Sequence, residues 1–513
     1  MLFRPARGML WDTWIFSHHD RFYLFWLQDR NGGFVWDSLG LAQSNDLVHW
    51  REIGTIVEKA ADAEEWMGTG RTWRAGDRFL LSFSEFRSGV QSIRFAQSSD
   101  LETWTRVDFP PLEPDGRWYV TQPAESPEPW VRLDLLCPTQ LADGSWIGHC
   151  TAHDRSAPPG VRSVIGLARS GDGVHWVMAP PASRVAVPLA EVSGTAVFHD
   201  RWYAFLSMHE LWGPRFDPHT HGQQGNGMWY WCADRPEGPF APPDHDSLLQ
   251  GQRATENSAL FGAPFRAAGH WLWNHHWLDA EGKAWLAPVK VLVEERPWRL
   301  ALKYWEGNDR LRGEAIETGP VLPVSFPRPR PTSRLAVDWS TGADWIEGST
   351  EHGAGVAVVD LGLPAGRGAM VTAELSFPRP GAGGAGLFVG GATDKVPVPK
   401  PGLPALGPEA DGLALLVHPT GRAVLARATM GYATPRLSHW ETFDIPPLEG
   451  EKARLRLMAR GSFVEMYLDD RLLRTLSLTT GQTFSGRIGL WIDRCAAALR
   501  DLRAWRIDLL GEE

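Results

Sequence analysis

The sequence predicts an all-β protein in which a five-bladed β-propeller is followed by a β-sandwich. Three observations lead to this fold class. The 513 residues include 53 Gly and 39 Pro, which favour turn-rich β structure over helix bundles. A turn followed by an aromatic strand recurs five times before residue 280. Beyond residue 335 the chain becomes a run of short alternating strands separated by Gly and Pro.

The repeated strand element begins with Asp or Gly at a turn and continues into aromatic and aliphatic residues. Its five turns lie at positions 20, 77, 143, 200 and 269, so that successive copies are 57, 66, 57 and 69 residues apart. This spacing is typical of four-stranded propeller blades with generous loops. We therefore expect residues 1–318 to form the propeller, residues 319–335 a Pro-rich linker or crossing strand, and residues 336–513 the sandwich.

A second repeated element, Ser-x-Asp-x-x-x-Trp, follows three of these strands. It occurs at Ser44–Trp50, Ser98–Trp104 and Ser170–Trp176. We expect the Asp to accept hydrogen bonds from its own backbone in a turn, and the Trp to pack between neighbouring blades. Many of the 27 Trp residues are then part of the scaffold. In the sandwich region, Asp469 and Asp470 predict a two-residue hairpin turn.

The overall charge argues against several classes of partner. Lys and Arg total 51 against 61 Asp and Glu, a formal net charge of −10, so we expect no nucleic acid and no membrane among the partners. No apolar run of about 18 residues and no apolar leader occur, which predicts a cytoplasmic protein. The sequence contains no phosphate-binding glycine loop and no Ser/His/Asp nucleophile motif. We expect no metal and no other cofactor.

Acidic residues fall near the same place in three of the five predicted blades. Asp12, Asp134 and Glu191 lie eight or nine residues before the turn of their blade, in the strand that faces the central funnel of a propeller. Blade two has Gly68–Gly70 there, and blade five offers Glu256 slightly earlier. Carboxylates that lie close together push their pKa values apart. Glycoside hydrolysis needs such a pair, because one carboxyl must be ionised while another carries a proton.

The motifs beside these acids resemble glycoside hydrolase family 32, the invertase, inulinase and levanase group of five-bladed propeller enzymes. The resemblance is strongest in Leu41–Trp50, and it extends to Phe25–Gln28 and Trp36. It covers nearly the whole chain, because members of that family also carry a C-terminal β-sandwich. The family's Arg-Asp-Pro motif corresponds here to Arg132-Leu133-Asp134, with an inserted Leu.

The resemblance implies a role for each acid. Asp12 matches the nucleophile, Glu191 the acid/base, and Asp134 the aspartate that stabilises the transition state through sugar hydroxyls. The apolar face of a sugar stacks well on indole rings, and Trp residues surround Asp12 in the sequence. The residues expected to contact substrate are Trp11, Trp14, Gln28, Trp36, Thr69, Arg132 and His275.

These observations predict a retaining glycosidase that removes a terminal furanosyl residue, expected to be β-fructofuranosyl, from short oligosaccharides. One alternative is an inverting arabinofuranosidase or xylosidase like those of glycoside hydrolase family 43, since several family 32 motifs are altered. A second alternative is a carbohydrate-binding protein without catalysis on the same scaffold. The sandwich resembles concanavalin-like lectin modules, and it is the expected surface for any homo-oligomer.

Overall fold

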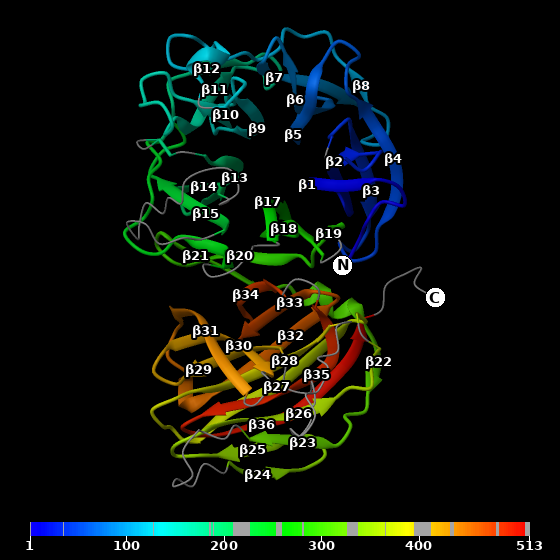
Figure 1. The fold of residues 1–513 in the computed structure, drawn as a ribbon. Coiled ribbons are helices and arrows are strands. Elements are labelled where there is room, and N and C mark those ends of the chain that lie inside the picture. The colour runs from blue at the N-terminus through cyan, green and yellow to red at the C-terminus, as the bar shows by residue number, and fades with distance from the viewer. Residues whose placement is uncertain are drawn as a thin grey trace. The chain divides into compact units, whose positions relative to one another are not determined.

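The computed structural model confirms an all-β fold (Figure 1). The residues that it describes are 2–33, 35–126, 128–183, 186–187, 189–208, 226–252, 259–279, 282–325, 337–364, 366–393, 412–430, 435–478 and 482–507. The chain divides into two compact units, and the main parts of the first and second meet in sequence at Gly307 and Asn308. No helix among the described residues is long and apolar enough to cross a membrane.

The first unit is the predicted five-bladed propeller. Four four-stranded antiparallel sheets and then the antiparallel strands of a fifth blade follow one another along the chain, and the first strand of each blade lies nearest the centre of the ring (Figure 1). The strands of blades one and two are β1 (Met9–His18), β2 (Arg21–Asp29), β3 (Ser38–Ser44), β4 (Arg51–Glu58), β5 (Glu64–Ala75), β6 (Arg78–Arg87), β7 (Val90–Ser98) and β8 (Thr105–Arg106). Those of blade three are β9 (Leu133–Gln140), β10 (Trp146–His153), β11 (Ser163–Ser170) and β12 (Val177–Ala179).

Blades four and five complete the ring. Their strands are β13 (Glu191–Phe198), β14 (Arg201–Met208), β15 (Asn226–Ala233), β16 (Leu248–Gln252), β17 (Ala259–Ala267), β18 (His270–Leu278), β19 (Ala284–Leu286), β20 (Lys290–Arg296) and β21 (Arg299–Tyr304). The N-terminal residues close the ring, because Leu2 N–H donates to the Leu286 carbonyl and Leu286 N–H donates to that of Phe3. Asn274 Nδ2 adds hydrogen bonds to the carbonyl and hydroxyl of Thr13, both at 2.9 Å.

The Ser-x-Asp-x-x-x-Trp elements form the predicted turns. In the first copy, Ser44 Oγ accepts the backbone N–H groups of Asp46 and Leu47, while Asp46 Oδ1 accepts those of Val48 and His49. The copies that follow β7 and β11 repeat these four bonds. Each turn thus satisfies backbone donors that no strand partner could reach.

Tryptophans of this element pack between blades, as predicted. Trp104 of blade two meets Phe25 of blade one edge-on, with ring centroids 5.8 Å apart. Trp176 of blade three meets Trp73 of blade two in the same way at 6.3 Å. Edge-to-face pairs of this kind add stabilisation beyond the area that they bury. These tryptophans therefore hold blade to blade.

All five innermost strands carry a β-bulge near the same level. The pairing register gains one residue between Trp11 and Trp14 in β1, and between Gly68 and Arg71 in β5. Equivalent shifts follow Asp134 in β9, Val192 in β13 and Leu260 in β17. A bulge bends its strand and re-aims the side chains beside it. It thereby alters which side chains of these strands face the centre of the ring.

The second unit is a sandwich of two sheets. One has the order β23 (Val321–Ser325), β26 (Ala354–Asp360), β35 (Gln482–Asp493), β28 (Ala385–Thr393), β29 (Gly412–His418), β30 (Arg422–Met430) and β31 (Pro435–Asp444). The other has the order β34 (Arg471–Ser477), β33 (Phe463–Leu468), β32 (Lys452–Arg460), β27 (Ala369–Arg379), β36 (Ala496–Ile507), β25 (Ile346–Ser349) and β24 (Asp338–Thr341), with β22 (Arg312–Ile316) beside β36. Buried aliphatic residues of both sheets form one core. The 3-10 segments described in the chain are η1 (Pro123–Glu125), η3 (Glu306–Leu311) and η5 (Glu449–Glu451).

Two local predictions concern this part of the chain. The Asp469-Asp470 turn joins β33 and β34 with φ values of 48° and 62°, the left-handed pair that a type I′ hairpin requires. Part of the segment predicted as a linker or crossing strand is a strand, because Val321–Ser325 pairs with β26. Pro323 lacks an N–H, but β23 lies at the edge of its sheet, where that loss is tolerated. Residues 326–335 of the predicted linker lie outside the described residues.

Replacing Asp46 tests the blade turn. Asp46→Ala removes the acceptor of two backbone hydrogen bonds, and we expect it to lower the free energy of unfolding by about 1–2 kcal/mol in urea titrations. Asp46→Asn keeps an oxygen in the same place and should lose much less. Equal losses in the two variants would show that the turn does not depend on this acceptor.

Candidate active site

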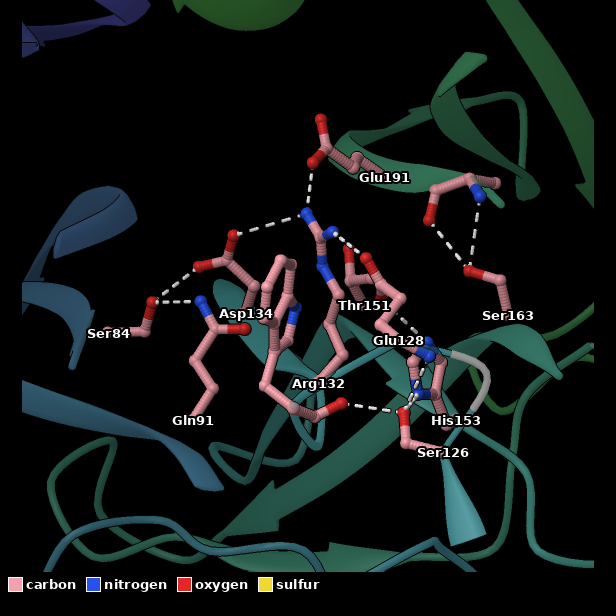
Figure 2. Close-up of polar contacts among 12 residues, drawn as sticks. Ser84, Gln91, Ser126, Glu128, Arg132, Asp134, Thr151, His153, Ser163 and Glu191 are labelled. Atoms are coloured by element: carbon pink, nitrogen blue, oxygen red, sulfur yellow. Dashed lines mark hydrogen bonds and ion pairs between the residues drawn. The ribbon is translucent and has the colours of Figure 1, made fainter. Parts of the chain in front are cut away.

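Acidic side chains from three blades lie together around one arginine. Asp12 belongs to β1, Asp134 is the second residue of β9, and Glu191 is the first residue of β13. Arg132 Nη2 donates a hydrogen bond to Glu191 Oε1 and lies 3.9 Å from Asp134 Oδ2, as Figure 2 shows. Asp12 interacts electrostatically with the other three residues. The structure thus brings together the three acids predicted as catalytic and the predicted substrate residue Arg132.

Asp12 lies within the bulge of β1. Its φ of 40° is left-handed, a conformation that Asp adopts more readily than most non-glycine residues. The hydroxyl of Thr69, from the corresponding bulge of β5, donates to Asp12 Oδ2. Blade two therefore supplies a hydrogen-bond donor at the level where blades one, three and four supply acids. Thr69, predicted as a substrate residue, is in direct contact with the predicted nucleophile.

Asp134 is held by a short polar chain that sequence reasoning did not find. Ser84 Oγ donates to Asp134 Oδ1 at 2.6 Å, and Gln91 Nε2 donates to Ser84 Oγ at 2.7 Å (Figure 2). The backbone N–H of Leu135 donates to the same carboxylate oxygen at 2.9 Å. A Cβ at Gly68 would collide with both Ser84 Oγ and Asp134 Oδ1. The glycine in the acid-free slot of blade two was the available signal, because it leaves room for this bond.

Burial raises the pKa of all three carboxyls. For Asp12 the largest cause is desolvation, followed by the negative charge of Glu191, and its pKa lies well above the ordinary value. Desolvation is also the largest cause for Glu191 and Asp134, and the positive charge of Arg132 opposes it in both. Such a cluster holds a proton at a pH where an exposed carboxyl would have lost it. It can therefore present an acid and a carboxylate side by side.

Two predicted substrate residues form an aromatic pair, and one of them, Trp11, precedes Asp12 in the chain. The rings of Trp11 and Trp36 stack with centroids 5.2 Å apart and planes 18° from parallel. The imidazole of His276 lies 4.6 Å from the Trp11 ring. Trp11 and Trp36 are both half-buried, so part of each indole surface is open to a ligand. His276 is a neighbour that the sequence did not single out.

Three other predicted substrate residues lie in the interior instead. Trp14 is 2% exposed, because it follows the bulge and packs in the core of blade one against Phe25. Gln28 Oε1 accepts from Ser38 and Thr55 within the same blade. His275 is fully buried, with Nε2 2.7 Å from Lys290 Nζ. Side-chain alternation through a bulge and pairing with a neighbouring strand explain this burial, and substrate contact by these three residues stays a prediction.

Two further polar residues lie beside the cluster: Glu128 contacts Arg132, and His153 contacts Glu128. Glu128 Oε1 accepts from Arg132 Nη1 at 3.3 Å, and Glu128 Oε2 lies 3.2 Å from His153 Nε2. Sequence reasoning did not assign Glu128, because a spacing of four residues predicts contact only on a helix and this segment is a loop. The predicted acid of blade five, Glu256, lies outside the described residues. Within the part of the chain that the structure describes, no group of three His, Cys, Asp or Glu side chains is arranged to hold a metal ion.

The geometry of both units is shared with known enzymes. Sucrose-6-phosphate hydrolase from Lactobacillus gasseri aligns with a TM-score of 0.66 at 15% identity, over 98% of this chain and 92% of that one. The fructan 1-exohydrolase IIa of Cichorium intybus, solved with 1-kestose, gives 0.64 at 14% identity, over 99% and 97%. The family 32 β-fructofuranosidase of Bombyx mori, solved with sucrose, gives 0.64 at 13% identity, over 99% and 93%.

This chain has the fold of the glycoside hydrolase family 32 enzymes. The likeness covers nearly the whole chain and confirms the predicted propeller and sandwich. No protein-family model matches the sequence, and no curated protein matches it. The sequence identity to these structures is 12–15%, so the likeness is one of fold.

Replacing Asp12 tests the electrostatics of the cluster without any substrate. A carboxyl whose pKa is raised by folding costs no stability below its unfolded pKa of about 3.9, and it destabilises the fold increasingly as pH rises above that value. We therefore expect Asp12→Asn to raise the thermal unfolding midpoint by a few degrees at pH 7, with the gain disappearing toward pH 4. Calorimetry across this range measures it. The exposed Asp108→Asn serves as the control, and a lowered midpoint at pH 7 would contradict the assignment.

Proposed function

We propose that this protein is a retaining glycoside hydrolase that removes a terminal furanosyl residue, β-fructofuranosyl, from short oligosaccharides. The observation that carries the proposal is the group of three buried carboxyls, from three blades, gathered around Arg132. The fold is that of enzymes solved with sucrose and 1-kestose, which supports an oligosaccharide as substrate.

In the first step Asp12 attacks the anomeric carbon. Thr69 engages Asp12 Oδ2, so Oδ1 is the attacking atom. As the bond from Asp12 to the sugar forms, the glycosidic bond breaks, and Glu191 gives its proton to the departing oxygen. In the second step Glu191 takes a proton from water, whose oxygen attacks the anomeric carbon and releases Asp12. Two displacements at one carbon retain its configuration.

The remaining residues hold the sugar. Asp134 Oδ1 is occupied by Ser84 and Leu135, so Oδ2 is the atom that would accept hydrogen bonds from sugar hydroxyls. Trp11 and Trp36 offer indole surface to an apolar sugar face. This arrangement positions the ring before reaction, which is worth more to the rate than contact energy alone.

The carboxyl cluster holds a proton, and Glu191 must carry that proton when the reaction begins. In the ligand-free cluster Arg132 favours the ionised form of Glu191, whereas Asp12 has burial and the charge of Glu191 against its ionised form. Sugar hydroxyls that donate to Asp12 would add to the hydrogen bond from Thr69 and stabilise its charge. We propose that substrate binding thereby moves the proton from Asp12 to Glu191.

The decisive experiment combines a substrate panel with two variants. Sucrose, fructo-oligosaccharides and aryl arabinofuranosides are incubated with the protein, and proton NMR identifies the anomer that is released first. We expect fructose in the β configuration. Asp12→Asn and Glu191→Gln should each lower kcat by roughly 1,000-fold or more. Asp100→Asn, a conservative change in an outer turn of blade two, is the control that should keep full activity.

Other outcomes would replace the proposal with a specific alternative. Full activity in both variants would remove these acids from the mechanism. Hydrolysis of arabinofuranosides with inverted configuration would favour a family 43-like enzyme. Oligosaccharide binding without product at any pH would indicate a carbohydrate-binding protein on this scaffold.

A further inference from the structure

Besides Asp134 and Glu191, Arg132 contacts the carboxylate of Glu128. Its Nη1 donates to Glu128 Oε1 at 3.3 Å, while Nη2 contacts Glu191 and Asp134 (Figure 2). Glu128 lies in the loop between η1 and β9, and its side chain is 18% exposed. The Arg132 guanidinium thus contacts three carboxylates. Two of these are predicted catalytic residues and the third is not.

Glu128 is itself held in place by a buried histidine. His153, the last residue of β10, is fully buried, and its Nε2 lies 3.2 Å from Glu128 Oε2. Its Nδ1 lies 3.2 Å from the hydroxyl of Ser126, and that hydroxyl is also 2.6 Å from the Trp130 carbonyl. Contacts at both nitrogens fix the plane of the imidazole ring. The chain of contacts from β10 to Arg132 therefore passes through Glu128.

The charges of this chain bear on Glu191. Desolvation favours the protonated form of Glu128, but His153 and Arg132 outweigh it and lower the pKa of this carboxyl, so Glu128 is ionised near neutral pH. Burial lowers the pKa of His153, although the contact with Glu128 opposes that effect. The negative charge of Glu128 in turn raises the pKa of Glu191. Glu128 competes with Glu191 for Arg132, and this favours the protonated form of Glu191.

We propose that Glu128, held by His153, is a positioning residue: it fixes the Arg132 guanidinium between Asp134 and Glu191 and takes a share of its charge. This inference rests on the proposed function, because it concerns the protonation of Glu191, the proposed acid/base that must begin the reaction protonated. Without Glu128, Arg132 would pair fully with Glu191 and hold it ionised.

The kinetic test uses Glu128→Gln, which keeps the shape of the side chain and removes its charge. We expect kcat to fall roughly 10- to 100-fold, with KM changed much less. The alkaline limb of the pH profile of kcat/KM should move to lower pH, because Glu191 loses its proton more easily. Glu125→Gln is the matched control, since Glu125 is the last residue of the preceding η1 but pairs with Arg155. A merely structural role for Glu128 would lower activity without moving the limb.

His153→Asn provides a second variant should Glu128→Gln fold poorly. It removes the support of Glu128 but leaves the charge of that carboxylate in place. The alkaline limb should move in the same direction by a smaller amount. An unchanged limb in a well-folded variant would remove His153 from the proposal.

A third measurement needs no substrate. Thermal unfolding at pH 7 compares Glu128→Gln, Glu191→Gln and the double variant. Each single variant leaves Arg132 one close carboxylate, but the double variant leaves only Asp134 at 3.9 Å. We expect the midpoint of the double variant to lie below the value obtained by adding the shifts of the two single variants. Additive shifts would overturn the proposal, whereas non-additive shifts in a protein that hydrolyses no glycoside would overturn only the proposed function.

Discussion

The ion pair between Arg132 and Glu191 is the interaction on which the rest of the site depends. Arg132 and the carboxyls of Asp12 and Asp134 are buried, and the Glu191 side chain is 13% exposed, so an isolated charge would be strongly destabilising here. Arg132 keeps a single positive charge there, because burial lowers its pKa less than the neighbouring carboxylates raise it. Removing the arginine would leave uncompensated buried carboxylates. A propeller can hold such a group because five rigid blades surround it.

The bulges explain how three different strands direct acids to one point. Asp12 lies within the bulge of β1, Asp134 immediately precedes the bulge of β9, and Glu191 lies two residues before the extra residue of β13. The three acids therefore lie at similar sequence distances from the turns of their blades, but at different positions relative to the bulges of their strands. A bulge changes the direction of the side chains next to it. Bulges thereby let one architecture direct carboxyls from three different strands to one point.

The carboxyl cluster destabilises the fold, and other features of the propeller stabilise it. The carboxyl cluster destabilises the fold as pH rises, since folding raises the pKa of each acid. Blade turns and interblade aromatic pairs such as Trp73 and Trp176 provide compensating stability far from the site. Ser84, Gln91 and Glu128 form the contacts that hold the charged groups of the cluster in place. They do not depend on substrate, so they keep the cluster ordered before a ligand arrives.

The sequence by itself determined the propeller, the sandwich and the acids worth considering. Turn spacing, the repeated Ser-x-Asp-x-x-x-Trp element and the Asp469-Asp470 hairpin are local patterns, and local backbone chemistry is enough to interpret them. Tertiary structure alone decided which side chains meet. It placed Trp14, Gln28 and His275 in the interior, and it added Glu128 and His153 behind Arg132. The physical reason is that bulges break the alternation from which facing is predicted, while contacts between blades join residues far apart in the chain.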